Sequence, residues 1–146
     1  MKLPTVRIEE LEKLAEEFRS KLTPKNKGAM VVALSGSLGA GKTAFARALA
    51  RAFGIDEDVT SPTYVIEKVY LPTRGQFKRF IHIDAYRLNG AHDLAVLGWK
   101  DLIQESGNII LVEWPEKVEG AIPKDALQIS LEFIDEDTRA ITYDLA

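Results

Sequence analysis

The segment GSLGAGKT, residues 36–43, restricts the possible folds of this chain most, because its residues have the spacing G-x-x-x-x-G-K-T. The apolar run AMVVALSG, residues 29–36, comes directly before it and is typical of a strand buried on both faces of a sheet. The alanine-rich stretch at residues 43–53 has the pattern of a helix, which Gly54 would end. A buried strand, a glycine-rich turn and a helix in succession indicate an α/β domain.

Residues 36–43 also have the composition of a phosphate loop. Gly36, Gly39 and Gly41 allow the backbone to turn with positive φ and to approach a ligand closely, so that successive N–H groups surround phosphate oxygens. Lys42 would reach the β- and γ-phosphates, and the Thr43 hydroxyl would bind Mg2+. A joint that is glycine-rich for steric reasons is the alternative, but the flanking strand and helix favour nucleotide binding. The candidate nucleotide-binding residues here are Ser37, Leu38, Gly39, Ala40, Gly41, Lys42, Thr43 and Ala44.

The rest of the chain predicts further helices and strands on either side of this unit. The expected elements are a helix at residues 8–18 with Thr5 as a possible N-cap, a hairpin at 64–71 and 77–84, a helix at 93–104 with a possible break at Gly98, a strand at 108–114 and a hairpin at 126–134 and 139–145. The order α-β-α-ββ-α-β-ββ predicts one α/β domain over residues 1–146, of the P-loop NTPase type. Its mixed, mostly parallel sheet would be flanked by helices and would include β-hairpins.

Two acidic residues follow apolar runs and are candidates for the second half of a nucleotide-hydrolysing site. Asp84 ends FIHID and Glu113 ends IILVE. Ligands of open α/β sheets bind beyond the carboxyl ends of the strands, so acids at these positions could hold the metal or orient the attacking water. Surface acids at strand ends are the alternative for each residue. We favour Glu113 for the metal and Asp84 for the water, although the opposite division is almost equally consistent with the sequence.

The segment TSPTY, residues 60–64, is a candidate switch that senses the γ-phosphate through Ser61 and Thr63, although it could also be a simple turn. His82 could be a core or rim histidine. Arg87 could contact phosphate, brace Asp84 or form a surface ion pair.

Composition limits the class of protein. The net charge of −3 argues against a protein that binds nucleic acid by itself, although RNA could be met inside a larger complex. Cysteine is absent, so disulfides and thiolate metal sites are excluded. No run of 18 apolar residues occurs, and the charged, amphipathic start is unlike a secretory signal. We therefore expect a cytoplasmic protein without a membrane partner.

Four motifs together, GSLGAGKT, TSPTY, HIDAYRL and VEWPE, resemble the TsaE (YjeE) family of small bacterial P-loop ATPases. The patterns S-P-T-[FY], H-x-D-x-Y-R and E-W-P-E of this family occur here at residues 61–64, 82–87 and 113–116. The resemblance extends over residues 34–116, and the combination is far more specific than the phosphate loop alone.

This resemblance implies a function that the residues alone could not reveal. Family members act in the N6-threonylcarbamoyladenosine modification of tRNA, where they bind the transferase heterodimer TsaD–TsaB and hydrolyse ATP to reset it between turnovers. It implies ATP or ADP and Mg2+ as cofactors, hydrolysis stimulated by the partner, and contact with tRNA only through the complex. It also implies metal ligands at Thr43 and Glu113, a required Asp84, and a nucleotide near Trp114. With Lys42, the two acids are the candidate catalytic residues.

One departure from the family pattern and two competing functions remain. The family commonly has aspartate where this chain has Ser37, which removes a charge but leaves the backbone N–H groups, Lys42 and Thr43 in place.

A small-molecule phosphotransferase would use the same loop, but it needs an acceptor pocket and usually a lid with arginines. Arg87 is the only arginine between Asp84 and Glu113, which disfavours this function. A nucleotide-dependent binding module without useful catalysis is the other alternative.

Overall fold

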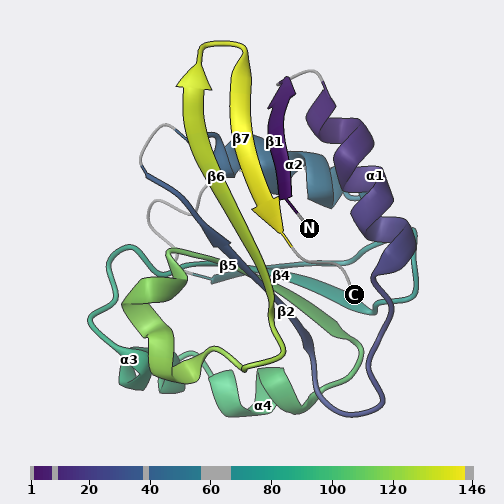
Figure 1. The fold of residues 1–146 in the computed structure, drawn as a ribbon. Coiled ribbons are helices and arrows are strands. Elements are labelled where there is room, and N and C mark those ends of the chain that lie inside the picture. Colours follow the sequence, from purple (N-terminus) through teal and green to yellow (C-terminus); the bar gives the residue numbers. More distant parts are fainter. Residues whose placement is uncertain (1, 8–9, 38–39, 57–66, 144–146) are drawn as a thin grey trace.

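A computed structural model describes residues 2–7, 10–37, 40–56 and 67–143 of the chain (Figure 1). Its helices and strands, in chain order, are β1 Lys2–Arg7, α1 Leu11–Lys21, β2 Met30–Ser35, α2 Lys42–Ala52, β3 Glu67–Tyr70, β4 Arg79–Asp84, α3 Ala91–Ala95, α4 Trp99–Gln104, β5 Asn108–Glu113, the 3-10 helix η2 Pro115–Ala121, β6 Leu127–Asp135 and β7 Thr138–Tyr143.

One sheet of seven strands has the order β1-β7-β6-β2-β5-β4-β3. Its centre is parallel, because β2 pairs in parallel with β5 and β6, and β5 pairs in parallel with β4. The pairs β1–β7, β6–β7 and β3–β4 are antiparallel. Five strands therefore run in one direction and only β3 and β7 run in the other, which confirms the predicted mixed, mostly parallel sheet with hairpins.

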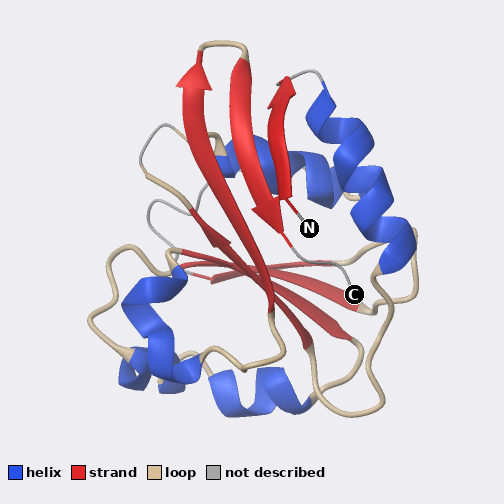
Figure 2. Ribbon diagram, viewed as in Figure 1, coloured by secondary structure: helices blue, strands red, loops and turns tan. Residues whose placement is uncertain are grey.

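Helices cover both faces of this sheet (Figure 2), so the domain has three layers. On one face, α1 and α2 pack through Phe18, Phe45 and Leu49 against inward side chains of the central strands. On the other face, α3, α4 and η2 pack against the alternate residues of the same strands, among them Ile81 and Ile110. Because side chains alternate along a strand, each central strand supplies apolar residues to both cores. The prediction of an α/β domain flanked by helices is confirmed.

The N-terminal prediction was partly wrong. Thr5 does not cap a helix, since it lies in β1, which pairs with β7 at the other end of the chain. The helix begins later, at Leu11, and the Glu10 carboxylate before it accepts a hydrogen bond from the Arg7 N–H at 3.0 Å. A short edge strand that contains Pro4 has a weak sequence signal, because its stability comes from pairing with a distant strand.

Gly98 separates two helices, and Trp114 precedes a third. The predicted break at Gly98 is confirmed, because this residue has φ 78° and separates α3 from α4. The helix η2 was not predicted, and it starts directly after Trp114.

Within the described part of the chain, no helix is both long enough and apolar enough to cross a membrane.

Glu67, the first residue of β3, gives a pH-dependent prediction. Burial raises the pKa of this half-buried carboxyl above its usual 4.5, and its Oε2 atom has no hydrogen-bond partner among the described residues. The carboxyl of Glu67 therefore has a higher pKa in the folded than in the unfolded protein. Its contribution to the free energy of unfolding is complete below about pH 4.5 and is lost as the pH rises through the folded-state pKa. We expect Glu67→Gln to raise Tm at pH 7 and the gain to shrink on acidification. Circular dichroism melts at several pH values would measure this, with exposed Glu132→Gln as control; an equal gain at every pH would contradict it.

Candidate functional site

The candidate phosphate loop, residues 36–43, connects β2 to α2 at the carboxyl edge of the parallel strands. Two of its glycines are required by the structure. Gly36 has φ 148°, and a Cβ atom there would lie 2.4 Å from the Leu131 carbonyl oxygen. Gly41 has φ 93° and immediately precedes α2, whose first backbone bond runs from the Phe45 N–H to the Gly41 oxygen. At these two glycines the backbone therefore has the positive φ that the sequence predicted. Leu38 and Gly39 lie outside the described residues.

Lys42 folds back over this loop. Its ammonium donates hydrogen bonds to the carbonyl oxygens of Gly36 and Ser37, the latter at 3.1 Å. The side chain is only 6% exposed, and this burial lowers the pKa of the Lys42 ammonium. Nearby negative charges partly oppose this decrease and raise the pKa of Lys42; they belong to the carboxylates of Glu113, Glu116 and Asp84. A desolvated positive charge is thus held above the loop, with three carboxylates in its field.

The residues next to Lys42 continue the candidate loop into α2. Thr43 is half-buried and is the second residue of α2, whereas Ala44 is exposed beside it. Ala40 is fully buried, and its N–H donates to the Ser37 oxygen at 3.1 Å. The positive dipole end of an 11-residue helix and the Lys42 charge therefore lie at one place.

The two predicted acids are neighbours. Asp84 is the last residue of β4 and Glu113 the last of β5, and the two are paired in the parallel register. Glu113 is only 2% exposed, whereas Asp84 is half-buried and accepts a hydrogen bond from the Tyr86 N–H at 3.1 Å. The structure brings both acids to the edge that carries Lys42. Their roles in binding metal and in orienting water stay predictions.

His82 holds Glu113. The histidine is fully buried on β4, and its Nε2 atom shares a hydrogen bond with Oε2 of Glu113. Residues two apart on a strand point to the same face, so His82 lies on the face of Asp84. This spacing could have indicated from the sequence that His82 belongs to the site and not simply to the core.

Trp114 closes the site from the side of η2. It has φ 60°, a left-handed conformation found at no other non-glycine position among the described residues. Its ring lies under the Lys42 ammonium, 3.9 Å from ring centroid to nitrogen, and contacts the Tyr86 ring at a centroid distance of 4.9 Å. Such strain persists only where the surroundings impose it, and it is common at functional sites. The position of Trp114 beside the nucleotide stays a prediction.

The remaining residues of interest are not part of the group formed by Lys42, Asp84 and Glu113. The switch candidates Ser61 and Thr63 lie outside the described residues. Arg87 is exposed on the loop after β4. Trp99, the first residue of α4, was not a site candidate and is only 6% exposed. Arg139 was missed by the sequence reading, yet it donates a hydrogen bond into the phosphate loop. No motif indicates this contact, because it depends on how the last hairpin folds over the loop.

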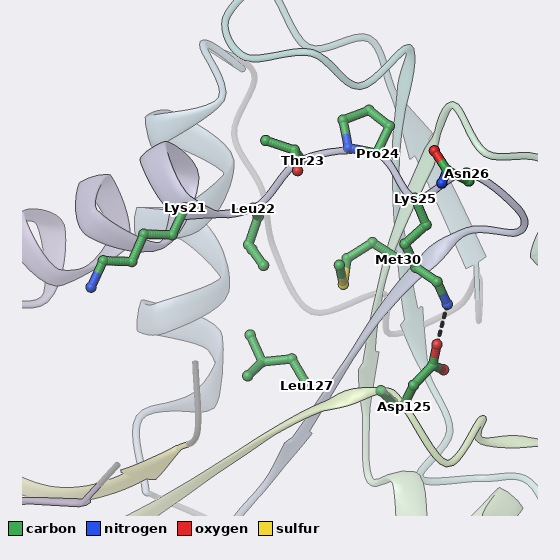
Figure 3. Close-up of a pocket in the computed structure, with 10 residues that line it drawn as sticks. Lys21, Leu22, Thr23, Pro24, Lys25, Asn26, Met30, Asp125 and Leu127 are labelled. Carbon is green, nitrogen blue, oxygen red and sulfur yellow. Dashed lines mark hydrogen bonds and ion pairs between the residues drawn. The ribbon is translucent and has the colours of Figure 1, made fainter. Parts of the chain in front are cut away.

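A separate hollow lies at the opposite edge of the sheet (Figure 3). It is lined by residues before and at the start of β2 and β6, among them Pro24, Met30 and Leu127, and the ion pair of Lys25 with Asp125 spans it. Because it lies at the amino ends of the parallel strands, it is remote from Lys42, Asp84 and Glu113. It is therefore not an extension of the candidate site.

Comparison with known proteins agrees with this geometry. The family model described as "Threonylcarbamoyl adenosine biosynthesis protein TsaE" matches residues 5–141. A protein of Treponema pallidum named "tRNA threonylcarbamoyladenosine biosynthesis protein TsaE" is 37% identical over 112 residues, which cover 77% of this chain and 79% of that protein. A protein of the same name from Rickettsia bellii is 32% identical over 132 residues, 90% of this chain and 85% of that protein.

A solved structure shows the same fold. The crystal structure of Bacillus subtilis YdiB has a TM-score of 0.76 and 31% sequence identity to this chain, and the match covers 100% of this chain and 86% of that one. The order of helices and strands that places the phosphate loop beside Asp84 and Glu113 is therefore shared with an experimentally determined relative.

Proposed function

The chain belongs to the TsaE family, and from this premise we propose that it is a Mg2+-dependent ATPase acting in the threonylcarbamoyladenosine modification of tRNA. One observation carries the proposal. The Lys42 ammonium lies over a phosphate loop at the edge of the sheet where Asp84 and Glu113 end neighbouring strands. This combination offers a cradle for phosphates together with the acids that hydrolysis needs.

The described part of the loop fits a nucleotide phosphate. Gly36 and Gly41 both have positive φ, a backbone geometry with which successive N–H groups can turn toward a ligand. The Lys42 ammonium binds two neutral carbonyl oxygens, and the charged oxygens of ATP or ADP would be stronger acceptors for it. Phosphate binding would also relieve the cost of a buried positive charge.

Thr43 and Glu113 are the residues that would hold Mg2+. This ion is commonly bound by one or two protein oxygens, with water and phosphate oxygens completing its shell. That agrees with the absence, among the described residues, of a cluster of three or more acidic or histidine side chains that could hold a metal alone. Bound there, Mg2+ would neutralise charge on the phosphates. His82 would keep the Glu113 carboxylate in one orientation.

Asp84 would orient the attacking water. Its carboxylate is fixed at one oxygen by the Tyr86 N–H, and it lies beside Glu113 without being as deeply buried. A carboxylate in this position can accept a hydrogen bond from water and align it with the γ-phosphate.

The proposed partner is the TsaD–TsaB heterodimer, with tRNA met through that complex in the cytoplasm, as the family resemblance implies. The described arginines near the site support a need for a partner. Arg87 is exposed on its loop, and Arg139 directs Nε and Nη1 to backbone carbonyls. An arginine that stabilises the transition state contributes about 10³- to 10⁵-fold to hydrolysis. Slow hydrolysis by the chain alone and faster hydrolysis in the complex are therefore expected.

A small-molecule phosphotransferase is a weaker proposal. The hollow in Figure 3 lies at the wrong edge of the sheet to receive a phosphate from the loop. A binding module without catalysis would need the same loop but not the adjacent acids, so hydrolysis distinguishes it from an ATPase.

Trp114 offers a direct test of nucleotide binding. In a Trp99→Phe background it is the only tryptophan of the chain. We expect ATP with Mg2+ to change its fluorescence in a saturable way, because phosphates would draw the Lys42 ammonium from the indole ring 3.9 Å away. Parallel calorimetry would give the affinity, and guanosine triphosphate would measure base preference. Absence of heat and of any fluorescence change at millimolar ATP would contradict the proposal.

A further inference from the structure

Arg139 connects the last hairpin to the outer side of the phosphate loop. It lies on β7, and its Nε atom donates a hydrogen bond to the Ala40 carbonyl oxygen at 3.0 Å. The side chain is only 8% exposed. Its guanidinium also packs against Gly41, where a Cβ atom would come within 3.2 Å of Nε. The arginine thus contacts the two residues that immediately precede Lys42.

The Ala40 carbonyl needs such a donor. The C=O and N–H groups of one trans peptide point in opposite directions, so a Gly41 N–H that faces a ligand leaves the Ala40 carbonyl facing away from it. A buried carbonyl without a partner is costly. Ala40 is only 1% exposed, so its carbonyl oxygen needs a hydrogen-bond donor from the protein instead of from bulk water. A charged donor gives a stronger bond than a neutral one, and it fixes the orientation of the Ala40–Gly41 peptide.

The hairpin in turn fixes the guanidinium. The Nη1 atom of Arg139 donates hydrogen bonds to the backbone carbonyl oxygens of Asp135, at 2.6 Å, and of Thr138, at 2.9 Å. The Phe133 ring centroid lies 4.9 Å from Cζ, a cation–π contact. Residues 131–135 of β6 continue beyond its pairing with β2 and pair with β7, so the β6–β7 hairpin projects past the end of β2 (Figure 1). With Nε and Nη1 bound to backbone, Arg139 acts on the loop and not on the reacting phosphate.

We propose that Arg139 is a positioning residue for nucleotide binding: it holds the Ala40 carbonyl outward, so that the loop N–H groups and Lys42 face the phosphates. This inference rests on the proposed nucleotide-binding function and extends it to the β6–β7 hairpin.

The test compares Arg139→Met and Arg139→Lys with Arg79→Met, an equivalent change at an exposed arginine at the opposite edge of the sheet. Calorimetry would measure the Kd of ATP with Mg2+ at a temperature where circular dichroism shows each variant folded. Loss of one charged hydrogen bond predicts an increase in Kd of about tenfold or more for Arg139→Met. Arg139→Lys should recover little of it, because an ammonium cannot reproduce a planar fork of donors. The control should bind like the unchanged chain.

The outcomes separate three accounts. A lower Tm with unchanged Kd in a folded Arg139→Met variant would make Arg139 merely structural and overturn the inference. If that variant did not fold, an unchanged Kd in folded Arg139→Lys would overturn it equally. Failure of the unchanged chain itself to bind ATP would instead overturn the proposed function, and the inference with it.

Discussion

Replacement of Lys42 by alanine is expected to abolish measurable ATP binding. The ammonium is buried over the phosphate loop, where it would meet the β- and γ-phosphates in a site of low exposure. Removing one partner of a desolvated charge pair typically costs about 2–5 kcal/mol, so Kd should rise by roughly 30-fold to several thousand-fold. Isothermal titration of ATP with Mg2+ would measure the change.

The matched control for this variant is Lys100→Ala, at an exposed lysine on α4 in the layer across the sheet. It should bind ATP with unchanged affinity. The Lys42→Ala variant should fold, because burial lowers the pKa of Lys42 and its charge is therefore a cost to the nucleotide-free protein. An ATP affinity equal to that of the unchanged chain would refute the phosphate-loop assignment.

Replacement of Glu113 by glutamine should separate binding from hydrolysis. Glutamine keeps the shape and can still accept a hydrogen bond from His82, but it removes the charge that would bind Mg2+. A metal typically supplies several kcal/mol of transition-state stabilisation, so kcat should fall by about 100-fold or more while ATP affinity without Mg2+ stays the same. Phosphate release as a function of Mg2+ concentration would measure the loss.

Asp84→Asn is the informative comparison, because Asp84 and Glu113 are paired in register at the same edge. If Asp84 orients water, its variant should lose hydrolysis but keep the Mg2+ dependence of ATP binding. A fully active Glu113→Gln variant would instead assign the metal to Asp84. Glu113→Ala is less suitable as the main variant, since it would leave the buried His82 ring without its acceptor.

The sequence predicted the centre of this site because its signals are local. The apolar run of β2, the glycines and the helical pattern of α2 are contiguous, so the placement of Lys42 and Thr43 needed no knowledge of the fold. That Asp84 and Glu113 lie at the same edge followed from a general property of parallel sheets, whose carboxyl ends meet at one edge.

The contacts that sequence reading missed join distant parts of the chain. Strand β1 is stabilised by β7, and Arg139 reaches Ala40 across 99 positions. The hydrogen bond of His82 with Glu113 joins neighbouring strands whose order the local pattern does not specify. Each of these depends on strand order, which hydrophobic periodicity alone does not determine.

We propose above all that this chain is an ATPase stimulated by the TsaD–TsaB heterodimer. The most direct test is steady-state ATP hydrolysis by the purified chain with Mg2+, with and without the TsaD–TsaB heterodimer, and with Lys42→Ala in both conditions. We predict slow hydrolysis by the chain alone, a marked increase with the heterodimer, and none in the variant. Equal slow rates in both conditions would contradict the proposed partnership, and activity that persists in Lys42→Ala would contradict the site.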